Sequence, residues 1–248
     1  MTAAAAALLP AGFLGSFGGA IDFIFSARPS VDGSVQVGGL TQIGDLVSTQ
    51  LVISLVALAL AILIAMPIGL YLGHRGTGEF LAVAVGNAGR AVPELALIAL
   101  MLAFVGTGTV NVTIAVMILG IPPILTNTFV GLRQVDQGAV DAARGIGMSE
   151  LEIVRRVELP LAMPTIMGGV RTASVNIIAT STIGSLAGVA TLGDLILGEN
   201  VYGIEGVIAG ALLVALLALT FEVVLAGVQR LLTPGGLALQ RHAARGTA

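Results

Sequence analysis

Long uncharged apolar runs constrain this chain more than any other feature of its sequence. The run at 46–73 contains no Asp, Glu, Lys or Arg, and a membrane-spanning helix needs about 20 consecutive apolar residues. Charged residues make up 10% of the chain and hydrophobic residues 56%, whereas a soluble domain carries roughly 25% charged residues. The sequence therefore predicts an all-α integral membrane protein.

Further apolar segments follow at 80–105, 110–130, 165–189 and 206–231. Short hydrophilic breaks at 74–79 and 106–109 and a long charged loop at 131–164 separate the first four segments. Pro122 and Pro123 are expected to kink the third segment, because proline cannot donate a helical hydrogen bond. We expect about five core transmembrane helices, within a membrane domain at 45–234.

An N-terminal extension at 1–44 precedes this domain, and a short tail at 235–248 follows it. Phe17, Ile21 and Ile24 recur at helical spacing, which predicts a helix at the membrane interface or on the edge of the bundle. An extra spanning helix is the alternative. The stretch at 30–39 is expected to be a loop.

Arginine sets the expected orientation of the chain. Loops and ends that alternate to one side contain Arg75, Arg133, Arg144, Arg155, Arg156, Arg230, Arg241 and Arg245, whereas the connections at 106–111 and 190–205 contain no arginine. Basic residues gather on the cytoplasmic side of membrane proteins. The loop at 131–164 and the C-terminus are therefore predicted to be cytoplasmic.

Several classes of function are excluded or disfavoured by what the sequence lacks. The chain has no lysine and no Gly-x-x-x-x-Gly-Lys-Ser/Thr, so it does not bind ATP through a P-loop. It has two histidines, no cysteine and no hydrolase motif, so we expect no catalytic residue and no metal site. A net charge of −3 without a basic patch argues against nucleic acid.

One motif stands in the charged loop: Asp141-Ala142-Ala143, then Gly147, then Leu159-Pro160. Small alanines let another helix approach closely, and Gly147 can take the positive φ that ends a helix. Ser149 and Glu152 have capping-box spacing, and Pro160 is expected to stop the helix that they open. The loop should therefore fold as helix, tight turn, helix and stop.

This motif resembles the coupling loop of permease subunits of type I, binding-protein-dependent ABC importers. The resemblance implies a MetI-like permease fold and a non-catalytic transport subunit in the bacterial cytoplasmic membrane. It implies that Asp141, Ala142, Ala143, Gly147, Leu159 and Pro160 dock on a cytoplasmic ABC ATPase dimer, which carries ATP and Mg. A second permease chain and an extracellular or periplasmic binding protein are the other expected partners, besides the lipid bilayer.

Within that superfamily, three segments are similar to permeases for glycine betaine, choline, carnitine and related osmoprotectants. They are the segments at 89–97, 187–194 and 206–211. The resemblance implies uptake of a compatible solute by alternating access. The N-terminal extension departs from the family, and Arg90 stands where the family commonly has a small or hydroxylated residue. A permease for another small solute, such as an amino acid, and a secondary transporter remain alternatives.

Polar residues inside the apolar segments are candidates for the translocation pathway. They are Arg90, Pro93, Glu94, Asn127, Asn176 and Thr180. Arg90 and Glu94 are four residues apart, so one helix would place them on one face, where they either flank the pathway or form a structural pair. The polar face of the segment at 165–189 suits either a wetted pathway or close helix packing. Glu222 is expected to pair with an arginine.

Overall fold

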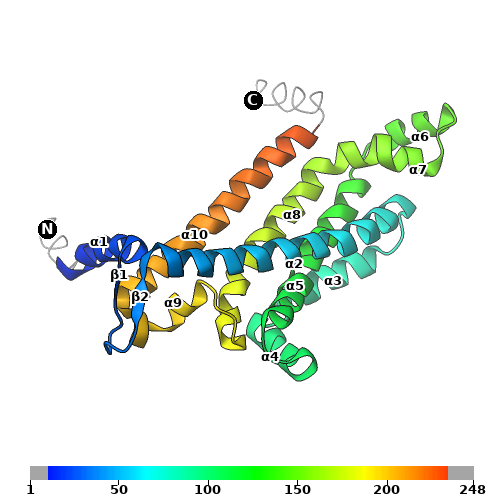
Figure 1. Ribbon diagram of the computed structural model, residues 1–248. Helices are drawn as coiled ribbons and strands as arrows, with labels where there is room; N and C mark the ends of the chain where they lie inside the picture. The colour runs from blue at the N-terminus through cyan, green and yellow to red at the C-terminus, as the bar shows by residue number, and fades with distance from the viewer. Residues whose placement is uncertain (1–10, 234–248) are drawn as a thin grey trace, which may run out of the picture.

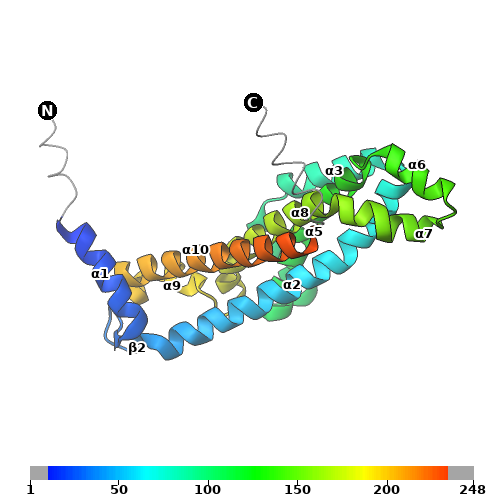
Figure 2. The ribbon, with the colours of Figure 1, turned by 90° about the horizontal axis from the view of Figure 1, so that it is seen from above.

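The computed structural model describes residues 11–233, which form helices and one small hairpin (Figure 1, Figure 2). The predicted tail at 235–248 and the first ten residues of the extension lie outside the described residues. In chain order the elements are α1 (Ala11–Phe25), β1 (Ala27–Pro29), β2 (Gln36–Gly38), α2 (Gly39–Arg75), α3 (Glu79–Ala91), α4 (Glu94–Val105), α5 (Thr109–Arg133), α6 (Gln137–Gly145), α7 (Glu150–Ile153), a π turn (Val154–Glu158), α8 (Leu159–Ser181), a 3-10 helix (Thr182–Ala187), α9 (Gly193–Leu197) and α10 (Glu199–Leu232).

Within the described residues, three helices are long and apolar enough to cross a membrane, namely α2, α5 and α10. The pair α3 and α4 makes a fourth span if the two are counted together. α8 has 23 residues and packs against α5 and α10, but its polar side chains leave it less apolar than those spans. The expected all-α membrane fold is confirmed, with α8 as a more polar core helix.

The sequence suggested one continuous span at 80–105, but this second apolar segment is bent. α3 and α4 meet at a bend of 94°, and Val92 and Pro93 between them are extended rather than helical. A residue that precedes proline is pushed out of the helical region by the proline ring. α5, by contrast, runs unbroken through Pro122 and Pro123.

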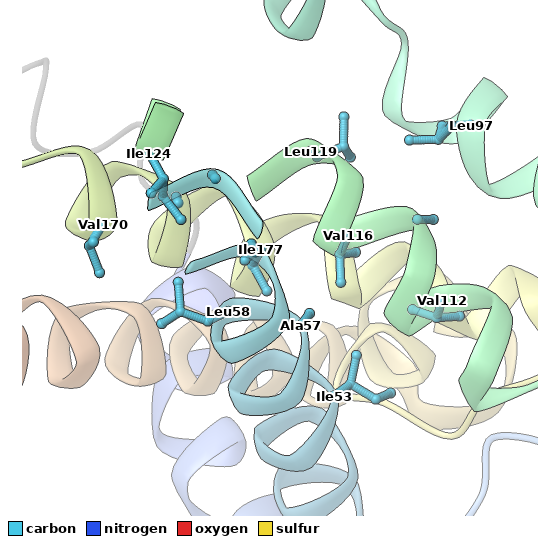
Figure 3. Close-up of a cluster of buried hydrophobic side chains, with 14 of the residues drawn as sticks. Ile53, Ala57, Leu58, Leu97, Val112, Val116, Leu119, Ile124, Val170 and Ile177 are labelled. Atoms are coloured by element: carbon cyan, nitrogen blue, oxygen red, sulfur yellow. The ribbon is translucent and has the colours of Figure 1, made fainter. Parts of the chain in front are cut away.

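The core is built where α2, α5 and α8 meet (Figure 3). Ile53, Val116 and Ile177 come from these three helices and point into the same apolar cluster. Gly69 of α2 lies so close to α5 that a Cβ there would be 2.7 Å from the Thr128 Cβ. Small residues at such contacts allow membrane helices to pack closely.

A buried amide ties α2 to α8 and to the start of α9. The Gln50 side chain is fully buried; its Nε2 donates to the Ile178 carbonyl at 3.1 Å, and its Oε1 accepts from the Leu192 N–H at 3.0 Å. Both contacts give the buried amide partners of its own, as buried polar groups require. They join α8 and the start of α9 to α2.

α1, the hairpin and the start of α10 pack together at the end of the molecule opposite α6 and α7 (Figure 1, Figure 2). Phe23 is fully buried there, with the Arg28 guanidinium 4.9 Å from its ring centre. The stretch at 30–39 is not only a loop, because Gln36–Gly38 pairs with Ala27–Pro29 in an antiparallel hairpin. Local sequence does not show that these two segments pair.

α2 connects these two ends. Its 37 residues correspond to about 55 Å at 1.5 Å per residue, whereas the hydrocarbon core of a bilayer is about 30 Å thick. The helix is therefore longer than an upright crossing of the bilayer requires, and it runs from the hairpin to the neighbourhood of the loop at 131–164 (Figure 1).

Candidate functional site

The motif loop, residues 131–164, carries two short helices joined by a tight turn. The Asp136 carboxylate caps α6 by accepting a hydrogen bond from the Gly138 N–H at 3.1 Å. In the turn, Gly147 has a φ of 88°, a conformation that side chains with a Cβ rarely adopt. The predicted positive φ and the predicted helix–turn–helix are confirmed.

Ser149 and Glu152 form the predicted capping box at the start of α7. The Ser149 N–H and hydroxyl donate to the same Glu152 carboxylate oxygen at 3.0 and 2.9 Å. These hydrogen bonds, led by the one from the backbone N–H, lower the pKa of Glu152 below its ordinary value. The carboxylate therefore stays ionised and fixes the entry to α7.

The second half of the loop differs from the expected stop at Pro160. α7 continues through the π turn Val154–Glu158 directly into α8, and Pro160 lies in the first turn of that helix. Proline in an α-helix clashes with the carbonyl four residues earlier and lacks an N–H. The π turn comes directly before α8, and the chain passes Pro160 without a break between α7 and α8. The helix is widened at this point rather than ended.

The motif's two alanines lie in different environments. Ala143 is 6% exposed and packs in a small core with Val140 and Ile153. Ala142 is exposed, and so is Ile146 four residues later, at 77%. Residues four apart lie on one helix face, so the tip of the loop presents a small, apolar surface. Sequence reasoning missed Ile146, although an isoleucine between two glycines in a charged loop was a usable signal.

Leu159 is half-buried and packs against the same small core as Ala143. Asp141 is exposed and pairs with Arg144 at 3.2 Å. Of the six predicted coupling residues, the structure thus presents Asp141, Ala142 and Gly147 to the surface, while Ala143 supports them from below.

Ion pairs hold α6 against α7. Arg144 donates to both carboxylate oxygens of Glu150, each at 3.2 Å. This two-point contact with a guanidinium lowers the pKa of Glu150 below its ordinary value. Planar pairs of this kind fix geometry better than a single contact does.

The predicted pathway residues on α3 and α4 do not share one helix face. Arg90 is in α3, whereas Glu94 begins α4 after the bend, so the spacing argument that paired them is wrong. Pro93 and Glu94 are exposed at this corner. The Arg90 side chain lies outside the described part of the structure.

Asn176 lines an open groove between α8 and α10, with a volume of about 460 Å³. Thr172 and the ion pair formed by Arg171 and Glu222 line it too. The pairing expected for Glu222 is therefore confirmed. Arg171 also donates to the Gln229 side chain at 3.0 Å.

Thr180 and Asn127 do not reach this groove. Thr180 is fully buried, and its hydroxyl has no hydrogen-bond partner in the described structure. The Asn127 amide donates to the Pro123 carbonyl of its own helix at 2.8 Å. The six predicted pathway residues are thus spread over several places, and their role in translocation stays a prediction.

Comparison with known proteins identifies the family. Residues 61–235 match the model of the binding-protein-dependent transport system inner membrane component. The choline transport system permease protein OpuBB of Bacillus subtilis is 39% identical over 189 residues, which cover 76% of this chain and 87% of that protein. The osmoprotectant import permease protein OsmY of Salmonella typhimurium is 33% identical over 178 residues, covering 70% and 75%.

Solved structures agree on the fold. The inward-facing MetNI methionine ABC transporter matches with a TM-score of 0.69 at 20% identity, covering 79% of this chain and 98% of that chain. An amino acid ABC transporter solved with histidines matches with a TM-score of 0.63 at 21% identity, covering 77% and 94%. The chain therefore belongs to the binding-protein-dependent inner membrane components, the permease subunits of ABC importers.

Proposed function

We propose that this permease carries a small osmoprotectant, of the glycine betaine, choline or carnitine type, into the cell. The observation that carries the proposal is the similarity to relatives named for these solutes. A second B. subtilis protein, the glycine betaine/carnitine/choline permease OpuCB, is 38% identical over 189 residues. The carnitine permease OpuCB of Listeria monocytogenes is 37% identical over 186 residues.

Selection of the solute takes place on an external binding protein. Quaternary ammonium groups are held by several aromatic rings, and this chain has no Trp, while its two Tyr and eight Phe are scattered along the sequence. The permease then has to provide a passage rather than a tight site. The partly exposed polar side chains of the groove on α8, with Asn176 among them, support a wetted surface there. Pro93 and Glu94 at the α3–α4 corner are further candidates.

The driving force comes from a separate ATPase dimer, which holds ATP and Mg. Ala142 and Ile146 form the surface that enters the ATPase, with Asp141 and Gly147 beside them and Leu159 and Pro160 continuing into α8. A ligand or partner shifts a protein between two conformations only if it binds one of them more tightly. The ATPase with bound ATP therefore binds one conformation of the motif loops more tightly, and the binding protein favours the outward-open conformation of the permease.

Two permease chains, identical or similar, enclose the passage. The arginine pattern supports a cytoplasmic motif loop and C-terminus, which leaves α1 and the hairpin outside, where the binding protein docks. A turn near Gly108 lies on that side as well, because its N–H donates to the Ala187 carbonyl at 2.9 Å beside α9.

Uptake assays test the solute. The chain is expressed with its ATPase and binding protein in cells that lack other osmoprotectant uptake systems, and labelled glycine betaine, choline, carnitine and methionine are supplied in turn. We expect uptake of at least one quaternary ammonium compound, and growth rescue by it at high salt. Uptake of methionine alone would refute the osmoprotectant proposal and favour an amino-acid importer.

A further inference from the structure

A histidine at the end of α2 lies between two carboxylates of the motif loop. Its Nδ1 is 2.8 Å from a Glu158 oxygen, and its Nε2 is 3.1 Å from a Glu150 oxygen. The side chains of His74 and Glu158 are only 14% and 7% exposed. The three residues come from α2, α7 and the π turn, so this contact joins elements far apart in sequence.

The contact of His74 with Glu150 and Glu158, called the His74 bridge below, follows from the chemistry of the three side chains. An ionised carboxylate only accepts hydrogen bonds, and an imidazole that carries protons on both nitrogens donates two. When both nitrogens carry protons, His74 holds both carboxylates at once. Burial of the Glu158 carboxylate without a partner would be costly, and His74 supplies that partner.

The π turn puts Glu158 in place. The extra residue of a π turn shifts the register of the helix, and such turns often occur at functional positions. A plain α-helix through Val154–Glu158 would turn Glu158 away from its present direction. The turn thus does more than accommodate Pro160.

The bridge continues to the surface of the motif. Glu150, whose carboxylate lies 3.1 Å from His74 Nε2, accepts hydrogen bonds from two nitrogens of Arg144. Arg144 also contacts Asp141 at 3.2 Å. A chain of charged contacts therefore runs from the first residue of the motif to the end of α2. α2 then continues through the core to the hairpin on the far side (Figure 2).

We propose that His74 is a positioning residue that fastens the motif loop to α2 and passes its movement on to that helix. The inference rests on the proposed function, in which an ATPase displaces the loop. With the bridge closed, the loop and α2 move as one body. With the bridge open, the ATPase moves the loop without moving α2 to the same extent.

The first test measures coupling in the complete complex in proteoliposomes. His74→Phe keeps a flat ring of similar size and removes both ring nitrogens, and His74→Gln keeps a single donor nitrogen. We expect ATPase binding to stay unchanged, because the exposed face at Ala142 and Ile146 is untouched. The ratio of solute transported to ATP hydrolysed should fall about tenfold for His74→Phe and less for His74→Gln, within the usual range of coupling between sites.

Two substitutions of Glu158 test the other side of the contact. Glu158→Gln keeps an acceptor for His74 and should retain most of the coupling, whereas Glu158→Leu should lose it. The matched control is Arg75→Gln, next to His74, where the guanidinium lies over the Tyr71 ring of the same helix. An unchanged transport ratio in both His74→Phe and Glu158→Leu would overturn the proposal.

A distance measurement tests the bridge without relying on uptake. The chain has no cysteine, so Leu55→Cys on α2 and Gly145→Cys on α6 take spin labels at single sites. In complexes with one labelled chain, we expect the same narrow distance distribution with and without ATP, and a shift or broadening with ATP in His74→Phe. An equal ATP-dependent shift in the chain with His74 would overturn the bridge. If the label-to-label distance in the chain with His74 stays unshifted but the complex shows no ATP-driven uptake, the result would instead count against the proposed function.

Discussion

Truncating Ile146 should weaken ATPase binding without unfolding the permease. The side chain is 77% exposed at the tip of the motif loop, so it contributes little to the fold of the chain alone. Removing its three outer carbons takes away apolar surface that docking would bury, at about 0.8 kcal/mol per carbon and about 2 kcal/mol in total. This corresponds to about a thirtyfold higher Kd.

The assay titrates purified ATPase against permease in nanodiscs. Ile204→Ala is the matched control, since Ile204 is 48% exposed on α10 near the hairpin, at the other end of the molecule. We expect Ile146→Ala to raise the Kd about thirtyfold and Ile204→Ala to leave it unchanged. If the Kd of Ile146→Ala stays within about twofold of the parent value, the tip of the loop is not the docking surface, whatever the motif resembles.

Three further changes test other parts of the account. Gly147→Ala should cost about 1 to 2 kcal/mol of strain at a φ of 88° and weaken ATPase co-purification, whereas Gly145→Ala, in open helical space, should not. Gly69→Ala should lower the melting temperature in detergent, because the new Cβ would clash with α5 and overpacking costs about 1 to 3 kcal/mol; an unchanged value would contradict the close contact. Hydrogen bonds from the Ser30 hydroxyl, the largest cause, and from the N–H and hydroxyl of Ser34 lower the pKa of Asp32 from 3.8 to about 2. Asp32 then supports the hairpin above about pH 4 and loses this effect as pH falls toward 2; carboxyl NMR should find the Asp32 pKa raised toward its ordinary value in Ser30→Ala.

Local signals in the motif loop were readable from sequence. Gly147 ends a helix in a tight turn, which a glycine can do through its own backbone, and the Ser149 and Glu152 box lies within four consecutive residues. The prediction that Pro160 ends the helix was wrong, because the effect of this proline depends on whether a π turn precedes it. That outcome is settled by α8 continuing into the membrane core, which no short window of sequence reveals.

Contacts between distant residues were beyond sequence reasoning. His74 and Glu158 are 84 residues apart in the chain, and neither carries a local signal that names the other. Arg90 and Glu94 gave the opposite error, since their spacing suggested one helix face and the bend at Pro93 separates them. Apolar length located α2, α5 and α10, because spanning a bilayer depends on a long apolar run more than on detailed contacts.

Transport by defined components tests the central claim most directly, namely that this chain is a passage driven by a separate motor. The permease is reconstituted in proteoliposomes with and without its ATPase, with binding protein and labelled glycine betaine outside and ATP inside. We expect accumulation against a gradient only when the ATPase and ATP are both present. Comparable accumulation from the permease alone, without the ATPase, would contradict the account.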